Sequence, residues 1–409
     1  MTERSGRIND CVVLSGPELE PFLCSSFEYE DGRITRMDIR GKAPQPIGKR
    51  PVIAPAFVNG HTHVGDCFLA DAATRLTLAE AFFRPNGFKY QSLATVPRNE
   101  HLDAMKGYLQ AMAASGTIAH FDFREQGLEG CRRLRETAQA VGVHSVILSQ
   151  FDGVPFSAEQ LEKNQEPLPD TFIAELHEIL QESDGFSEST MNDQTDTAWQ
   201  TIASICTEAN KAKTIHCLED ASYRDTSLAR TELGDLQRAI EILQPDLIVH
   251  LTVANDEEIA RIVSANIPVA INPRANATLG LPLPPVAKLL QAGVPLLLGT
   301  DNAMLNGANL MAELDFTYKL ARSQFGNQNQ IDPTVTLKMV TSNVALTRWG
   351  SELPGELSVG LPASFVEFDF SSPTLRTSHH CAATIVTRCQ PADIRQTVRN
   401  GHTIHQRKA

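Results

Sequence analysis

The chain has 409 residues, of which 42% are hydrophobic and 21% are charged, and its formal net charge is −13. This composition is ordinary for a soluble protein. The acidic balance, without any dense block of Lys or Arg, offers no basic surface to phosphates. It therefore excludes nucleic acid and an anionic membrane as expected partners.

The cysteines and the N-terminus indicate the compartment. The eight cysteines are scattered and form no C-x-x-C pair, which is typical of reduced core residues in a cytosolic protein. The first ten residues, MTERSGRIND, contain no apolar stretch of the signal-peptide kind, and no run approaches the roughly 20 apolar residues of a membrane span. We therefore expect a soluble, cytoplasmic protein.

Both ends of the chain consist of short strand-like stretches separated by turn residues. FEYEDGRITRMDIRG predicts two strands that form a hairpin around Asp31–Gly32. Near the other end, ASFVEFDF, AATIVTRC and RQTVRNGHTI are predicted as strands, with a second turn at Asn400–Gly401. We expect both ends to join into one small β domain, assigned to residues 1–53 and 351–409.

Between the ends, short apolar runs alternate with longer helical patterns. The eight runs are PVIAPAFVNG, GTIAHFDF, VHSVILSQF, the weaker DGFSEST, KTIHCLE, DLIVHLT, IPVAIN and VPLLLGTD. Helices are predicted over residues 101–114, 125–140, 171–182, 195–211, 231–243, 256–265 and 284–292. This alternation indicates parallel strands with crossover helices and fits a (β/α)8 TIM-type barrel over residues 54–350. An open doubly wound sheet is the alternative, but no G-x-G-x-x-G follows a strand, so dinucleotide binding has no support.

Polar residues follow the apolar runs where the strands are expected to end. The five residues are His61, His63, His216, His250 and Asp301. Residues two apart on a strand point to the same face, and in a barrel the carboxyl ends of all strands open onto one face. Imidazoles with one carboxylate are the ligand set that zinc or iron(II) prefers. A single histidine at a strand end is usually structural, but five such placements together predict a metal site.

Glu219 lies three residues after His216, in HCLE, and could reach a metal-bound water or the substrate. Taken alone, the spacing is a weak signal and fits an exposed loop residue equally well. Beside the predicted metal site, Glu219 is the best candidate for a general acid/base.

Several stretches resemble the amidohydrolase superfamily, in its aminohydrolase branch of cytosine, guanine and adenosine-type deaminases and chlorohydrolases. They are PAFVNGHTH, ASGTIAHFDF, IHCLE, IVHLT, INPRANATLGLPLPPV, LLLGTDNAM and TSNVALTRWG. HTHVGDCFLAD and HFDFREQG look closest to an archaeal chlorohydrolase-like subgroup. The resemblance implies a barrel, a small β-sandwich built from both termini, and a homodimer as the family-level expectation.

Carried over residue by residue, the resemblance assigns His61, His63, His216 and Asp301 as metal ligands. It assigns His250 to the metal-bound water and Glu219 to the proton shuttle. Binuclear relatives use a lysine at the end of the fourth strand, and DGFSEST has none. We therefore expect one divalent ion, with zinc preferred and iron(II) as the alternative.

Candidate substrate contacts are less defined. Arg124 and Glu125 follow the second strand. Two interpretations of Arg124 are equally supported: it binds a carboxylate or phosphate of the substrate, or it forms a structural ion pair with Asp122 or Glu125. Asp66 is a candidate for ordering its loop or binding an amine, and Gln150, Arg274 and Asn276 are further strand-end candidates. AFFRPNGFKY is interpreted as packing in preference to an active-site lid.

The resemblance implies hydrolytic deamination of an aminated heterocycle of purine, pyrimidine or pterin type by a metal-bound hydroxide. The small-molecule substrate itself is not identified by the sequence. The alternatives are hydrolysis of another C–N or C–Cl bond, as in a chlorohydrolase, a cyclic amidase or a formimino-type enzyme, and a non-catalytic binding protein. The missing lysine argues against the binuclear cyclic amidases.

Overall fold

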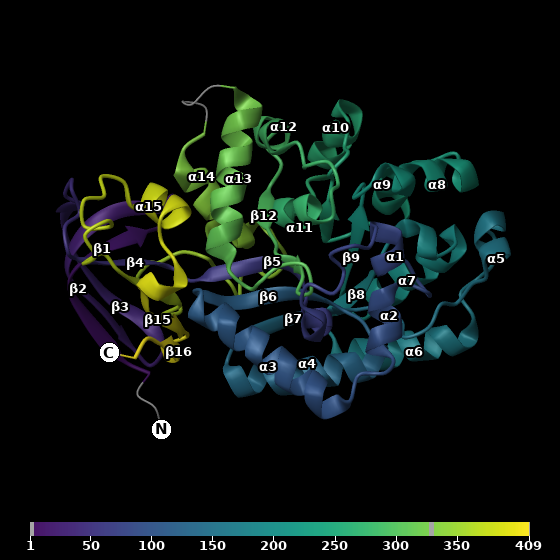
Figure 1. Ribbon diagram of the computed structural model, residues 1–409, viewed down its shortest axis with the longest axis horizontal. Coiled ribbons are helices and arrows are strands. Elements are labelled where there is room, and N and C mark those ends of the chain that lie inside the picture. The colour runs from purple at the N-terminus through teal and green to yellow at the C-terminus, as the bar shows by residue number, and fades with distance from the viewer. Residues whose placement is uncertain (1–3, 327–330, 409) are drawn as a thin grey trace.

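The computed structural model describes residues 4–326 and 331–408. The chain forms two sheets: one is built from both chain ends and the other forms the centre of a barrel (Figure 1). Within the described ranges, none of the helices combines the length and apolar character that crossing a lipid bilayer requires.

The sheet from the chain ends has the strand order β16-β15-β14-β4-β1-β2-β3. Its strands are β1 (Gly6–Ser15), β2 (Glu20–Glu30), β3 (Arg33–Lys42), β4 (Pro51–Pro55), β14 (Phe365–Asp369), β15 (Ile394–Arg399) and β16 (His402–Gln406). The predicted hairpins β2–β3 and β15–β16 are both confirmed. Phe27 packs edge-on against Phe365, with ring centroids 5.2 Å apart, so the two ends of the chain share one apolar core.

The second sheet contains only parallel strands, in the order β12-β11-β10-β9-β8-β7-β6-β5-β13. They are β5 (Phe57–His63), β6 (Thr117–Arg124), β7 (His144–Ser149), β8 (Gly185–Glu188), β9 (Ala212–Cys217), β10 (Leu247–His250), β11 (Val269–Ile271), β12 (Leu296–Leu298) and β13 (Asp301–Asn302). Only Gly299 and Thr300 separate β12 from β13, and β13 pairs with β5, so the sheet closes on itself. The predicted barrel is confirmed, and the open doubly wound sheet is wrong.

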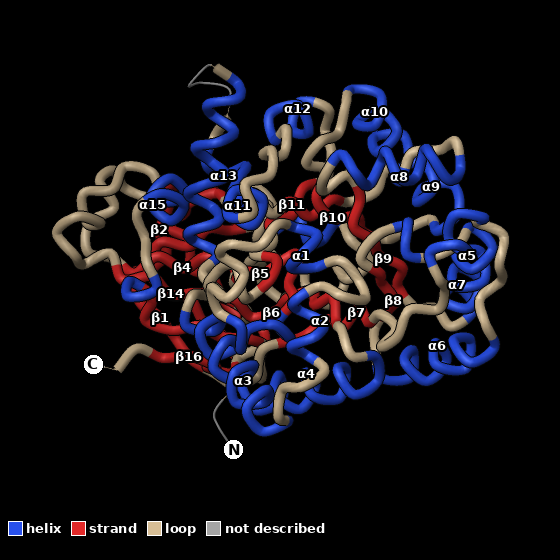
Figure 2. Tube along the Cα trace, turned by 45° about the vertical axis from the view of Figure 1, so that its right-hand side comes forward, coloured by secondary structure: helices blue, strands red, loops and turns tan. Residues whose placement is uncertain are grey.

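Helices surround the strands of the barrel (Figure 2). The α-helices are α1 (Leu78–Phe82), α2 (Phe88–Leu93), α3 (Arg98–Ala114), α4 (Gly127–Val141), α5 (Ala158–Lys163), α6 (Asp170–Glu182), α7 (Asp196–Glu208), α8 (Ala221–Thr231), α9 (Asp235–Arg238), α10 (Asp256–Ala265), α11 (Pro273–Thr278), α12 (Val286–Gln291), α13 (Leu310–Phe325), α14 (Pro333–Lys338) and α15 (Cys381–Thr387). Short 3-10 helices are η1 (Val64–Leu69), η2 (Met191–Asp193), η4 (Ser342–Leu346) and η5 (Pro391–Asp393), and η3 (Ala239–Leu243) is a π-helical turn.

Three local predictions differ from the structure. AATIVTRC forms helix α15, because Cys381, Ala382, Ile385 and Val386 lie on one helical face that is buried. The predicted strand depended on β-branched residues, whose preference tertiary packing overrides. The helix predicted over residues 231–243 begins at Asp235, and α8 precedes it. The run PVIAPAFVNG divides between β4 and β5, which belong to different sheets.

The barrel strands are buried on both faces. Every residue of β5, β6 and β10 is buried, although these strands contain polar residues. Helices cover the outside, and residues such as Phe121 and Phe186 belong to the main core. Polar side chains at the carboxyl ends of these strands must therefore find partners at one end of the barrel, where the loops gather.

Candidate metal centre and active site

Four imidazoles and one carboxylate meet at the carboxyl ends of the barrel strands. His61 and His63 come from β5, His216 from β9, His250 from β10 and Asp301 from β13. The Nε2 atom of His61 lies 3.1 Å from Oδ1 of Asp301, and Nε2 of His63 lies 3.7 Å from the same oxygen. All five side chains are buried. The structure therefore brings together the residues that the sequence proposes as ligands and as the water-binding histidine.

The hydrogen bonds of two histidines fix where their protons lie. Nδ1 of His63 lies 2.7 Å from Oε1 of Glu125, and Nδ1 of His216 lies 3.0 Å from the carbonyl oxygen of Glu188. Both Nδ1 atoms therefore donate, which leaves a lone pair on each Nε2 atom. These two Nε2 atoms lie 3.4 Å apart, an unfavourable contact unless a cation accepts both lone pairs. The donor set fits a divalent metal ion.

The protonation of the histidines agrees with this donor set. Burial lowers the pKa of His61 to about 3. Burial and the neighbouring imidazoles hold the pKa of His216 well below its ordinary value. Burial alone would raise the pKa of Asp301, but the hydrogen bond with His61 and the surrounding imidazoles outweigh it and lower that pKa. Neutral imidazoles and an ionised carboxylate are the forms that bind metal ions.

Two of these residues have strained backbones. His250 has a φ of 81° and Asp301 has a φ of 63°, both in the left-handed region that residues other than glycine rarely adopt. Such conformations cost of the order of 1–3 kcal/mol each and gather at functional sites. Asp301 lies 3.1 Å from His61 of β5, and the ring of His250 stacks on that of His216 of β9, with centroids 5.3 Å apart.

Glu219 lies on the loop that follows β9 and faces the same cluster. Its Oε2 atom is 3.5 Å from Nε2 of His250 and accepts a 2.9 Å hydrogen bond from the hydroxyl of Tyr223. Burial raises the pKa of Glu219, and the nearby Asp301 adds to that rise. A raised pKa favours the protonated carboxyl group, which can pass its proton on.

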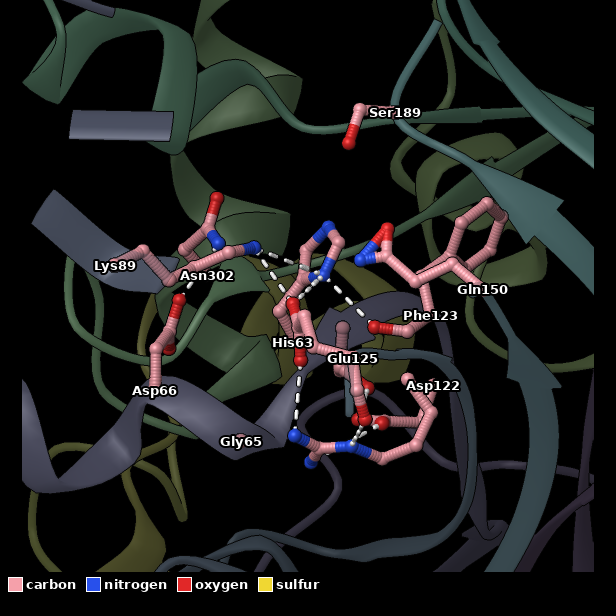
Figure 3. A network of polar contacts seen from close by, with 12 residues as sticks. His63, Gly65, Asp66, Lys89, Asp122, Phe123, Glu125, Gln150, Ser189 and Asn302 are labelled. Atoms are coloured by element: carbon pink, nitrogen blue, oxygen red, sulfur yellow. Dashed lines mark hydrogen bonds and ion pairs between the residues drawn. The ribbon is translucent and has the colours of Figure 1, made fainter. Parts of the chain in front are cut away.

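Glu125 bonds to His63 (Figure 3). It does not line the cavity. Its Oε1 atom accepts from Nδ1 of His63 at 2.7 Å and from Nζ of Lys89 at 2.6 Å, and its Oε2 atom accepts from Arg124 at 2.9 Å. Burial alone would raise the pKa of Glu125, but Lys89 and Arg124 outweigh it and lower that pKa. A carboxylate bonded to the outer nitrogen of a ligating histidine orients the ring and raises its basicity.

The other proposed substrate contacts also lie outside the cavity wall. Asp66 accepts from Nδ2 of Asn302 at 2.7 Å and from the backbone of Met304 at 2.9 Å, so it orders the loop after β13. Arg124 is fully buried and pairs with Glu125. Gln150 bonds the hydroxyl of Tyr90, at 3.2 Å.

Two candidates lie on α11. Nη1 of Arg274 lies 3.7 Å from Oε2 of Glu313, and the backbone N–H of Arg274 donates to Oε1 of the same carboxyl group at 3.0 Å. Asn276 is buried, and neither of its side-chain polar atoms has a hydrogen-bond partner among the described residues. Neither side chain lines the cavity at the metal cluster.

The cavity at the cluster is narrow, about 30 Å³. One wall consists of the polar cluster with Ser189, Tyr223 and Asn302. The opposite wall comes from α1, α2 and their connection, which contain AFFRPNGFKY, through Leu78, Phe82, Phe83, Lys89 and Tyr90. This volume is far below the roughly 300–1,000 Å³ of sites that hold a drug-sized ligand.

Sequence reasoning missed several residues of the site. Glu188 ends β8 and Ser189 follows it, so the strand-end rule that found the histidines could have found them. Lys89, Tyr90 and Tyr223 lie on short helices whose position depends on the folded barrel, and no spacing in the sequence marks them. Glu188 pairs with Arg84, whose Nη1 atom lies 2.7 Å from its Oε2 atom.

Comparisons with known proteins agree with the geometry. A protein of Methanothermobacter thermautotrophicus, provisionally named an aminohydrolase, is 30% identical over 361 residues, which cover 88% of this chain and 90% of that protein. A 5-methylthioadenosine/S-adenosylhomocysteine deaminase of Syntrophomonas wolfei is 25% identical over 434 residues, covering 97% of this chain and 94% of that protein.

Solved structures share the fold. A zinc-bound adenosine deaminase from Xanthomonas campestris superposes with a TM-score of 0.82 at 18% identity, covering 97% of this chain and 92% of that one. The sequence profile of the Amidohydrolase family matches residues 52–404, which include the whole barrel. The resemblance seen in the motifs is thereby confirmed, and the chain belongs to the amidohydrolase family.

Proposed function

We propose that the protein is a metal-dependent hydrolase that releases ammonia from an aminated heterocycle of purine, pyrimidine or pterin type. The observation that supports this most is the buried carboxyl group of Glu219, 3.5 Å from His250 and beside the proposed ligands. It provides a proton donor at a site built to activate water. The deaminase names of relatives along nearly the whole chain support the same reaction class.

His61, His63, His216 and Asp301 would hold one divalent ion, with zinc preferred and iron(II) as the alternative. Such an ion acts as a Lewis acid and lowers the pKa of water toward about 7. A single ion is supported by β8, which ends in Glu188 instead of a lysine. The Glu188 carboxylate is already paired with Arg84 at 2.7 Å.

The proposed reaction adds water across a C=N bond and then removes ammonia. His250 and Asp301 orient the attacking water, whose oxygen bonds to the carbon that bears the amino group. Asp301 accepts the first proton of this water, and Glu219 delivers a proton to the adjacent ring nitrogen. Glu219 then moves the remaining hydroxyl proton to the amino group, and the proton on Asp301 restores the carboxyl group of Glu219. The C–N bond breaks, ammonia leaves and a carbonyl group remains. Proton transfer by a positioned side chain contributes roughly 10²–10⁴ in rate.

The setting of the reaction is also part of the proposal. The net charge of −13 favours a small-molecule substrate over nucleic acid. We place the enzyme in the cytoplasm, as the scattered, unpaired cysteines suggest. The family resemblance suggests a homodimer.

The test measures the ammonia that the purified, metal-loaded protein releases from each compound of a panel. The panel contains adenosine, 5-methylthioadenosine, S-adenosylhomocysteine, guanine, cytosine and a pterin. Glu219→Gln serves as the inactive control. Ammonia from at least one compound, lost in the variant, supports the proposal. No ammonia from any of them, or chloride release from a chlorotriazine in its place, would count against deamination.

A further inference from the structure

The covering segment, residues 77–93, lies over the cavity at the proposed metal site. It contains α1 and α2, which have five and six residues and are too short to be stable alone. Its side chains form one wall of a cavity of only about 30 Å³. Sites that hold a drug-sized ligand have roughly ten times that volume or more, so an outward movement of this wall would make room for a heterocycle.

Polar side chains attach the covering segment to the barrel. Arg84 donates to the Glu188 carboxylate at 2.7 Å and to the carbonyl oxygens of Phe151 at 2.8 Å and Gly153 at 2.6 Å. The hydroxyl of Tyr90 lies 3.1 Å from Oγ of Ser189. These contacts reach the ends of β7 and β8. Arg84 bonds the side chain of Glu188, whereas the proposed ligand His216 bonds its backbone carbonyl oxygen, at 3.0 Å.

Lys89 makes a different contact (Figure 3). Its Nζ atom lies 2.6 Å from Oε1 of Glu125, and that same oxygen accepts from Nδ1 of His63 at 2.7 Å. The Lys89 side chain is 3% exposed, so water does not weaken the ion pair. One oxygen atom therefore serves both the covering segment and a proposed metal ligand.

Outward movement of the segment would remove Nζ from this oxygen. Oε1 would then serve only His63, and its hydrogen bond to Nδ1–H would strengthen. A stronger bond to that proton makes the imidazole a stronger donor at Nε2. The position of the covering segment thus changes the metal site through two short hydrogen bonds.

We propose that Lys89 is a positioning residue that couples closure of the covering segment to the donor strength of His63 through the shared oxygen of Glu125. The inference rests on the proposed metal-dependent function, yet it does not depend on which substrate is used. Because coupling is reciprocal, the state of the metal site also biases the segment between open and closed positions.

The test uses cobalt(II)-loaded protein, whose visible absorption reports the ligand field, together with hydrogen exchange of residues 77–93. Lys89→Met and Arg84→Met should each speed exchange in the segment about tenfold or more, since each removes charge-assisted hydrogen bonds. Lys89→Met should shift the cobalt bands, and Arg84→Met should shift them in the same direction. The double variant should add nothing to the shift of Lys89→Met. Arg75→Met, an exposed change on the preceding loop, should alter neither readout.

Rescue by a conservative variant separates positioning from simple destabilisation. Lys89→Arg keeps the positive charge, so its cobalt bands should lie closer to those of the wild type than the bands of Lys89→Met do. If Lys89→Met gives too little folded protein, Lys89→Gln takes its place. Cobalt bands in Lys89→Met that superimpose on those of the wild type would overturn the inference, as would additive shifts in the double variant. If the bands shift as expected but no compound on the panel yields ammonia, the proposed function fails and the coupling stands.

Discussion

The Nε2 atom of His250 lies 3.5 Å from Oε2 of Glu219, and both side chains are buried. Because burial raises the pKa of Glu219, its carboxyl group can keep a proton beside the histidine. Glu219→Gln keeps the shape of the side chain but cannot transfer a proton. We expect kcat to fall by roughly 10²–10⁴, with metal content unchanged, as measured by ammonia release and elemental analysis. A variant that keeps wild-type kcat would remove Glu219 from the mechanism.

The lone pairs that face each other on His63 and His216 predict a metal-dependent stability. Purified protein should contain one equivalent of a divalent ion, and His216→Ala should lower that content. Added zinc should raise the melting temperature of the wild type, because a ligand at 100 times its Kd stabilises the folded state by about 2.7 kcal/mol. The same addition should have a much smaller effect on His216→Ala. Two equivalents bound in the wild type would contradict the single-ion proposal.

Glu313, on α13, predicts a pH dependence of the free energy of unfolding. Burial raises its pKa to about 8, and the nearby Arg274 offsets this only in part. The folded state then binds more protons than the unfolded state between about pH 4.5 and 8, so the free energy of unfolding falls as the pH rises. The loss is at most about 1.4 kcal/mol for each pH unit in this range.

Glu313→Gln removes this titration while keeping an acceptor for the backbone of Arg274. The variant should gain stability relative to the wild type between pH 5 and pH 8, measured by urea unfolding at both values. Equal differences in unfolding free energy at the two pH values would show that Glu313 does not titrate in this range.

Trp199 tests the packing of the barrel against its helices. The side chain is fully buried on α7, and its indole N–H donates to the carbonyl oxygen of Met191 at 2.9 Å. Trp199→Ala should lower the free energy of unfolding by about 3–5 kcal/mol, because it leaves a cavity in the core. Trp199→Phe keeps an aromatic ring in the core and should lower the free energy of unfolding by less. A cost for Trp199→Ala below that of Trp199→Phe would contradict this account.

The meeting of the histidines and Asp301 was predictable because these residues obey a simple rule. His61, His216, His250 and Asp301 each follow a short apolar run, and parallel strands must open onto one end of a closed sheet. Local sequence pattern and barrel topology were therefore sufficient to predict that these side chains meet, without any knowledge of side-chain packing. The β2–β3 hairpin was predictable for a similar reason, since Asp31–Gly32 favours a tight turn.

Other features depend on contacts that no local pattern records. Glu125 was found as a strand-end residue, but its bond to His63 depends on the pairing of β5 with β6. Lys89 lies 26 residues after His63, on a short helix whose position depends on the finished barrel. Cys381–Thr387 has the composition of a strand, and only its packing makes it helical.

The pairing of β13 with β5 places His61 beside Asp301, 240 residues further along the chain. An ion held by both residues would act as a staple across this seam. In an unfolded chain, joining two points so far apart costs several kcal/mol of entropy, as in a long disulfide loop. Removal of the ion should therefore weaken the pairing of β13 with β5 before the other strand pairs of the barrel. The barrel should open first at this seam.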